Sequence, residues 1–511
     1  MRKEGAESTG SFRYWGIKRK TPADAGVDGT PRADYNGHQF DEKRGACPYM
    51  STTNKRSISI WALTWPIMIE MFLQFMLGTA DTLMVSRISD DAVAVTGIAN
   101  QFFNAIIVLF TLVCSGAGIL IAQKLGAGQP ADARTIAIMS VTVTAALGVA
   151  VSVVLALGTK PIVAALQVPD DIRPLAYTYM AVIGGGMAVT ALNLSLSTAV
   201  RNTGDTRSPM FISLAMNVIH IALNYAFIFG AFGFPQWGLF GVAVSTVISR
   251  LFALVLQIRL FRHAFGERIA FREFAVFDWP LFRQVLRIGW PLGINGGSWT
   301  LSQLVIFSII ASMGAQQLAA RTYMNTLESF AFTVGWSLAL AVQIRISHLY
   351  GAKAYKEAYY SAYKALAAGI VIVLANTALL LMFRHAVMRW FTADPWIVDT
   401  AVALLWLNLA LQPGKMFNMA LGQSLSAIGD SKFVMVTALA SMWIVSVGLS
   451  YALGIHLQWG LYGIYAAMIA DEYIRGIWSL VRWRHHRTKL TLAEGFRDAD
   501  ARRQAVVAAD L

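Results

Sequence analysis

Apolar stretches of transmembrane length recur along most of this 511-residue chain, and they constrain its fold more than any other feature. A helix needs about 20 apolar residues to cross the roughly 30 Å of hydrocarbon in a bilayer. Only 14% of the residues are charged, whereas soluble proteins carry roughly a quarter. The chain is therefore predicted to be an all-α integral membrane protein.

Hydropathy and turn-forming residues together predict twelve transmembrane helices. Their expected ranges are near 58–86, 93–122, 135–158, 174–199, 209–232, 238–261, 289–312, 319–344, 360–383, 398–422, 433–455 and 460–481. The longest internal polar segment separates the first six helices from the last six. The expected parts are a disordered extension at 1–56, an N-lobe at 57–262, a linker at 263–288, a C-lobe at 289–485 and a tail at 486–511.

Lysine and arginine gather in both tails and in alternate loops, which predicts the orientation in the membrane. The segments 1–56, 259–287 and 482–503 are rich in them, whereas the opposite loops are expected to hold few. Those few are Arg87, Lys160, Arg173, Arg321, Arg384 and Arg389. Because cytoplasmic loops carry the excess of positive charge, both termini are predicted to lie in the cytoplasm and the chain in the inner membrane. The net charge of +13 then needs no nucleic-acid partner.

An internal repeat relates the two halves. A shift of 225 residues superposes rare residues of one half on the same residues of the other: Trp65-Pro66 on Trp290-Pro291, Asn100 on Asn325, Gly126-Ala127 on Gly351-Ala352 and Gly204-Asp205 on Gly429-Asp430. Each half has an even number of helices, so the two repeats are parallel. Transporters built from such repeats bind substrate between them and work by rocking one against the other.

These landmarks resemble the multidrug and toxic compound extrusion (MATE) family over roughly residues 57–485. The matching segments are Trp65-Pro66 with Asp81-Thr-Leu-Met-Val-Ser86, Ile121-Ala-Gln-Lys-Leu-Gly-Ala127, Arg201-Asn-Thr-Gly-Asp-Thr-Arg-Ser-Pro-Met210 and Asn224-Tyr-Ala-Phe-Ile-Phe-Gly230. The resemblance implies two six-helix bundles around a central cavity. It also implies export of amphipathic, often cationic organic compounds, driven by a proton or sodium gradient.

Ionisable groups inside a membrane span are costly and are candidate functional sites. Glu70, Gln74 and Asp81 share one face of the first helix. The resemblance implies that Asp81 carries the proton and that Gln74 lines the cavity, while Glu70 is a second candidate for cation coupling. The alternative for each carboxyl is a permanently hydrogen-bonded structural acid.

In the fifth helix, Asn217, His220 and Asn224 share a face. Proton-linked members of the family can carry aspartate in place of Asn224 and asparagine in place of His220, so this chain departs from their pattern. His220 is a candidate for cation coupling because imidazole titrates near neutral pH. A packing role for His220 is the alternative, and Asn217 and Asn224 are candidate cavity residues.

The second half departs further from the sodium-coupled members of the family. Those members carry acids in the seventh and tenth helices, at positions that correspond here to Trp299 and Lys415. An ammonium group cannot ligate sodium, so a proton is favoured over sodium, and we expect Lys415 to pair with Glu328. Such a pair is either structural or part of a substrate cavity that would also accept anionic compounds. Asn100 and Asn325 are further candidate cavity residues.

Other charged groups are expected to be structural. Asp471, Glu472 and Arg475 are expected to pair locally. The segments that begin at Asp205 and Asp430 are expected to start helices, with the acid or a neighbouring hydroxyl as the cap. A role as cytoplasmic latches is the alternative for both segments. Arg250 needs an acidic partner that the sequence does not identify.

The remaining alternatives concern the cargo and the class of protein. A lipid-linked precursor flippase would need several arginines in the cavity, and the spans of the first half offer only Arg250. A membrane prenyltransferase would need two clusters of acids of the Asp-rich type, and an isolated pair such as Asp90-Asp91 does not make such a cluster. Cys47 and Cys114 form no disulfide framework or metal spacing. No nucleotide-binding motif occurs. We therefore expect a monomeric transporter, not an enzyme, that has no cofactor and exchanges a small organic molecule for a proton or sodium ion.

Overall fold

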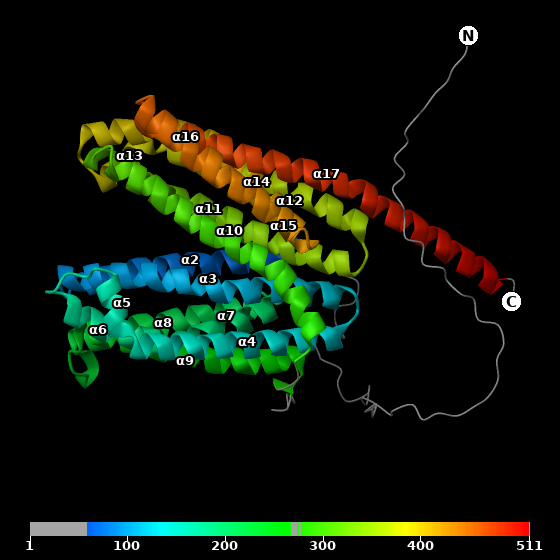
Figure 1. Ribbon diagram of the computed structural model, residues 1–511, viewed down its shortest axis with the longest axis horizontal. Coiled ribbons are helices and arrows are strands. Elements are labelled where there is room, and N and C mark those ends of the chain that lie inside the picture. The colour runs from blue at the N-terminus through cyan, green and yellow to red at the C-terminus, as the bar shows by residue number, and fades with distance from the viewer. Residues whose placement is uncertain (1–58, 267–272, 275–276, 510–511) are drawn as a thin grey trace, which may run out of the picture. The chain divides into compact units, whose positions relative to one another are not determined.

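The computed structural model describes residues 59–266, 273–274 and 277–509. The extension predicted at 1–56, with Cys47, lies outside the described residues. The described part of the chain is almost entirely helical and contains no β-strand. Its helices form two bundles that correspond to the two halves of the sequence (Figure 1).

The N-lobe contains seven long or medium helices and two short ones. They are α2 (Ile60–Val85), α3 (Asp90–Gly126), α4 (Pro130–Leu157), α5 (Thr159–Ala165), α6 (Arg173–Gly185), α7 (Met187–Arg201), α8 (Arg207–Phe229), η1 (Ala231–Gly233) and α9 (Gly238–Phe265). The pair α6 and α7 is bent by 41° at Gly186 and corresponds to one predicted span.

The C-lobe repeats this order. Its helices are α10 (Trp279–Ala311), α11 (Ala315–Gly351), α12 (Tyr355–Met382), α13 (Arg384–Phe391), α14 (Pro395–Ala427), α15 (Ser431–Ala440), η3 (Ser441–Val447), α16 (Gly448–Tyr451), η4 (Ala452–His456) and α17 (Gly460–Ala509). The four segments from α15 to η4 form one continuous span, in which η3 and η4 are π-helical. The bounds of α11 and α12 equal those of α3 and α4 plus 225 residues, so the repeat in the sequence is also a repeat in the fold.

The predicted twelve-helix, two-lobe architecture is confirmed. Ten helices among the described residues are long and apolar enough to cross a membrane, and the bent pair α6 and α7 makes eleven. The first half of α17 occupies the twelfth position and is less apolar because it carries Asp471, Glu472 and Arg475.

The two ends of the C-lobe differ from the predicted boundaries. Helix α10 starts at Trp279, inside the predicted linker, because the Asp278 side chain accepts a hydrogen bond from Leu281 N at 3.0 Å and Pro280 lies in the first turn. Helix α17 continues to Ala509, through the segment predicted as a tail.

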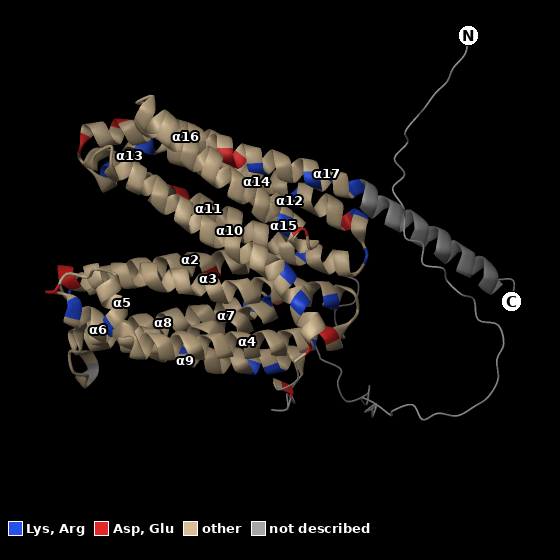
Figure 2. Ribbon diagram, viewed as in Figure 1, with Lys and Arg blue, Asp and Glu red and all other residues tan. Residues whose placement is uncertain are grey.

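The lobes contact each other through α2 and α3 on one side and α10 and α11 on the other. We call the end of the bundles at which α3, α7, α9, α11 and α14 finish the basic end, because the arginine- and lysine-rich loops lie there (Figure 2). Near this end, Leu63 and Ile67 of α2 pack with Ala341 and Ile344 of α11 in an apolar cluster that joins the lobes.

Candidate functional site

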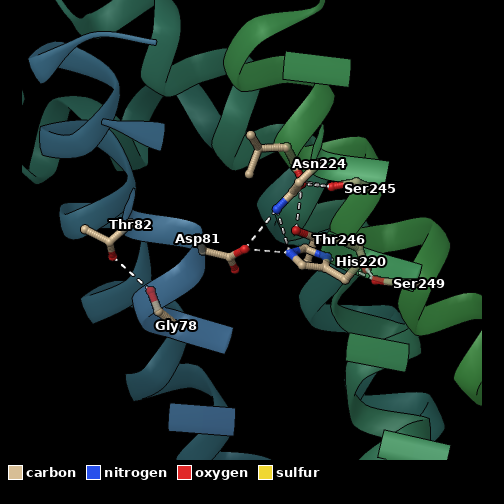
Figure 3. Close-up of polar contacts among 9 residues, drawn as sticks. Gly78, Asp81, Thr82, His220, Asn224, Ser245, Thr246 and Ser249 are labelled. Atoms are coloured by element: carbon tan, nitrogen blue, oxygen red, sulfur yellow. Dashed lines mark hydrogen bonds and ion pairs between the residues drawn. The ribbon is translucent and has the colours of Figure 1, made fainter. Parts of the chain in front are cut away.

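Asp81 lies at the centre of a hydrogen-bonded cluster in the N-lobe. Its Oδ1 is 2.9 Å from Nε2 of His220 and accepts a hydrogen bond from Nδ2 of Asn224 at 2.9 Å (Figure 3). His220 and Asn224 are one turn apart on α8, so both reach the same carboxylate oxygen across from α2. The structure therefore brings together three residues that the sequence placed on two separate helices.

Two serine residues of α9 contact His220 and Asn224 and complete the cluster. The hydroxyl of Ser249 is 3.2 Å from Nδ1 of His220 and 3.0 Å from the carbonyl oxygen of Thr246. The hydroxyl of Ser245 donates to Oδ1 of Asn224. Ser249 and Ser245 are buried, whereas the Asp81 side chain is 32% exposed. The carboxylate is therefore the most exposed member of the cluster.

A small cavity of about 100 Å³ adjoins Asp81. Its wall includes Asn100, Tyr179 and Arg250. The guanidinium of Arg250 donates to the Thr190 hydroxyl at 2.7 Å, and among the described residues it forms no ion pair. The partner acid expected for Arg250 is thus not found in the described part of the chain, and its charge shares the cavity with Asp81.

Three of the predicted N-lobe residues lie outside both this cluster and its cavity. The carboxylate of Glu70 is 3.7 Å from Arg201 and accepts a hydrogen bond from Ser213 at 3.3 Å, so Glu70 does not contact Asp81. Gln74 is exposed and does not line the cavity. Asn217 is buried, and neither atom of its amide has a hydrogen-bond partner among the described residues.

The C-lobe contains a buried network around Glu328. The predicted pair is present, with Nζ of Lys415 2.9 Å from Oε2 of Glu328. The other oxygen, Oε1, accepts hydrogen bonds from the Tyr465 hydroxyl at 2.6 Å and from Nη1 of Arg321 at 3.1 Å. Both carboxylate oxygens are thus held by charged or hydroxyl donors from α11, α14 and α17.

A larger cavity of about 470 Å³ opens beside this network. Lys415, Glu328 and Asn325 lie in its wall. One side is aromatic: the ring of Phe332 is stacked between those of Trp299 and Trp336, at centroid distances of 6.1 and 6.0 Å. The cavity can therefore hold a flat apolar molecule that also carries polar groups. Asn100 and Asn325, which are equivalent in the repeat, line one cavity in each lobe.

Two important residues were missed or misplaced by the sequence analysis. Arg321 was assigned to an outer loop, but it is 2% exposed within α11. Its distance of seven residues from Glu328, two helical turns, was the available signal. Tyr465 has no distinguishing signal in the sequence, because its contact with Glu328 spans 137 residues.

Of the predictions for the remaining charged groups, two are confirmed and one is wrong. Arg475 pairs locally with Asp471 at 2.6 Å and with Glu472 at 3.1 Å, as expected. Asp205 accepts hydrogen bonds from the backbone N–H of Arg207 and Ser208 at the start of α8, also as expected.

Asp430 makes no capping hydrogen bond at α15, so the prediction for this residue was wrong. Its carboxylate instead lies 2.6 Å from Nε of Arg482 and 3.0 Å from Nε2 of His486, both on α17.

Known proteins are similar to this chain over most of its length. The MatE family profile matches residues 66–226 and again 291–452, which together make up more than half of the chain. An uncharacterised transporter of Bacillus subtilis, YisQ, is 35% identical over 84% of this chain and 94% of its own length. A probable multidrug resistance protein, NorM, of Thermotoga maritima is 26% identical over 82% of this chain and 90% of its own.

Solved structures agree at the level of the fold. An outward-facing multidrug resistance MATE transporter superposes with a TM-score of 0.77 over 84% of this chain and 96% of its own, at 21% identity. The family profile, the repeat that it matches twice and the two-lobe fold lead to one conclusion: the chain belongs to the MATE family, a family of multi-pass membrane transporters and not of enzymes.

Proposed function

We propose that this chain exports organic compounds from the cytoplasm in exchange for protons, and that Asp81 and His220 together carry the proton. The observation that carries the proposal is the 2.9 Å contact between Oδ1 of Asp81 and Nε2 of His220. The names of NorM and other multidrug resistance relatives support organic compounds as cargo. The positive charge at the basic end supports a cytoplasmic location of that end, in an inner membrane.

The Asp81–His220 contact requires a hydrogen between the two atoms, because two lone pairs at 2.9 Å would repel. Ser249 allows two complete arrangements of hydrogens. In one, its hydroxyl donates to Nδ1 of a neutral His220, which donates from Nε2 to the carboxylate. In the other, which holds one more proton, Nδ1 donates to Ser249 and the hydroxyl turns to the Thr246 carbonyl. The cluster can thus gain or release a proton while its geometry stays nearly the same.

The C-lobe supports a proton over sodium as the coupling ion. Lys415 occupies a position where sodium-coupled members would place an acid, and its ammonium group already neutralises Glu328 at 2.9 Å. Trp299, at the other such position, contributes an apolar ring to the cavity wall. The aromatic cavity of the C-lobe is our candidate substrate site, with Asn325, Glu328 and Lys415 as its polar contacts. Asn100 lies in the small N-lobe cavity that adjoins Asp81.

The direct test is accumulation of a fluorescent organic cation in everted membrane vesicles. A pH gradient with an acidic lumen and a sodium gradient would be imposed separately on wild type, Asp81→Asn and His220→Leu. We expect the pH gradient alone to drive accumulation and both substitutions to abolish it. Accumulation that depends on sodium, or that survives Asp81→Asn, would refute the proposal. Asn104→Ala, in the wall of the same small cavity, controls for general disturbance of the lobe.

Arg250 supports a second candidate cargo, compounds that carry an anionic group. Its guanidinium shares a cavity with Asp81 and forms no ion pair within the described part of the chain. A zwitterion could place its cationic group at Asp81, where the proton competes with it, and its anionic group at Arg250. We then expect Arg250→Gln to weaken competition by a zwitterionic compound but not by a simple cation of similar size. Equal effects on both compounds would exclude this cargo.

A further inference from the structure

Two hydrogen bonds join the lobes at the basic end, and the internal repeat relates one to the other. Nε2 of Gln123 in α3 donates to the carbonyl oxygen of Ala427 at 2.6 Å. Nε2 of His348 in α11 is 2.9 Å from the carbonyl oxygen of Asn202, which can only accept, so the imidazole donates. The shift of 225 residues places Gln123 on His348 and Asn202 on Ala427. The two bonds are therefore the same contact made twice, once from each lobe.

Two glycines at the ends of the same helices let the backbones meet. A Cβ atom added at Gly126 would overlap the carbonyl oxygen of His348, and one added at Gly351 would overlap the carbonyl oxygen of Gln123. These glycines are also equivalent in the repeat. The ends of α3 and α11 thus cross at backbone contact distance, immediately beside the two hydrogen bonds.

The acceptors of both bonds are carbonyl groups at helix ends. Asn202 is the C-cap of α7 and Ala427 is the last residue of α14. At these positions the backbone carbonyl group receives no hydrogen bond from an N–H group of its own helix. Both residues are buried. Each lobe therefore caps a helix of the other, and the caps would be lost if the lobes separated at this end.

We propose that Gln123 and His348 form a twofold latch that holds the basic end closed in the transport cycle. The latch sets the ratio of closed to open molecules on that side, because both bonds exist only when the lobes touch. The inference rests on proposed transport in which the two lobes rock against each other, as expected from the internal repeat, but it is independent of the ion that drives it.

The test measures the separation of the lobes by pulsed electron paramagnetic resonance, without substrate and without any ion gradient. Spin labels would be placed at Ala131 in the N-lobe and Lys364 in the C-lobe, both exposed near the basic end, in a chain without its two native cysteines. Wild type is expected to give mainly one short distance. Since one net hydrogen bond changes an equilibrium by about fivefold, Gln123→Ala or His348→Ala should each raise the open fraction by about that factor. The double variant should raise it further, as a second, longer distance.

Matched substitutions separate a latch from general damage. His348→Gln keeps a side-chain N–H donor and reproduces the residue of the other lobe, so it should stay close to wild type. Gln129→Ala and His485→Ala remove the same residue types at the same end without touching the other lobe, and should have no effect. A folded double variant with the wild-type distances would overturn the proposal. If the double variant aggregates, the two single variants decide the question. An equal broadening of the distance distribution in His348→Ala and His348→Gln would then overturn the proposal.

A failure of the latch and a failure of proton antiport are distinguishable. Sodium-driven accumulation together with the expected change in distances would leave the latch standing and refute proton coupling alone.

Discussion

Buried charge is treated differently in the two lobes. Glu328 has a side chain only 4% exposed, and its two oxygens are held by Lys415, Arg321 and Tyr465. Asp81 is 32% exposed on the side chain and is held through one oxygen by His220 and Asn224. A group that exchanges a proton with water needs access to it, so the contrast favours Asp81 over Glu328 for the proposed proton coupling.

The C-lobe network predicts a large loss of stability when its central acid is removed. Glu328→Gln leaves the buried charge of Arg321 and the partly buried charge of Lys415 without a counter-charge, and breaking a buried pair costs about 3–5 kcal/mol. We expect a clear drop in the thermal unfolding temperature of the purified protein in detergent. Glu357→Gln removes a more exposed ion pair with Arg345 and should lower stability by about 1 kcal/mol or less. Similar drops in the two variants would show that the network is not stabilising.

At the scale of helices, equivalent acids of the two repeats join different elements. Asp205 holds the first turn of its own helix, α8, through backbone N–H groups. Asp430, its equivalent, ties the start of α15 to α17 through Arg482 and His486. The same position of the repeat therefore caps a helix in the N-lobe, as Asp205, and links two helices by ion pairs in the C-lobe, as Asp430.

The contacts of Asp430 with Arg482 and His486 predict that stability depends on pH. Partial burial raises the pKa of Asp430, but hydrogen bonds from His486 and Arg482 outweigh it and hold this pKa below the ordinary value. A carboxyl with a depressed pKa stabilises the fold above its unfolded pKa, about 3.9, and loses that effect as pH falls through the folded pKa. Asp430→Asn should therefore lower the unfolding temperature at pH 7, and the difference should shrink below about pH 4. Asp399→Asn, at an exposed position, is the control. A difference that is independent of pH would contradict the expectation.

At the scale of the molecule, the contact between the lobes depends on close approach of backbones. Gly116 in α3 faces Gly289 in α10, and a Cβ atom on Gly116 would lie 2.9 Å from the Cα of Gly289. The neighbouring atoms are backbone and cannot move aside without shifting a whole helix. At this crossing α3 and α10 approach so closely only because neither glycine has a side chain.

This crossing predicts which glycine substitutions disturb transport. Gly116→Ala should force α3 and α10 apart and reduce the initial rate of substrate accumulation several-fold. Gly97→Ala in the same helix adds the same atom where nothing lies within 4 Å, and should leave the rate unchanged. The initial rate in everted vesicles and the yield of folded protein check this together. Equal loss in both variants would point to helix propensity and not to the crossing.

Much of the fold was predictable because the hydropathy of the sequence and its internal repeat specify the helices and the two lobes. The twelve helices, the two lobes and the pairing of Lys415 with Glu328 were predicted, since apolar length limits the possible spans and a cation inside a span needs an acidic partner. The start of α10 at Trp279 was missed, because ten helical residues there are too polar to be recognised as part of a span.

The amino-acid sequence by itself determined that the chain lies in a membrane, how many helices it has and that they form two repeats. These features depend on the length of local apolar stretches and on residues at fixed spacing. The tertiary structure decided which polar groups meet. Glu70 and Asp81 share a helix face, yet one contacts Arg201 and the other His220, since each meets a different neighbouring turn. The bonds of Gln123 and His348 to the opposite lobe depend on a crossing of helices that lie far apart in the chain. Such contacts follow from packing, and no local pattern in the sequence encodes them.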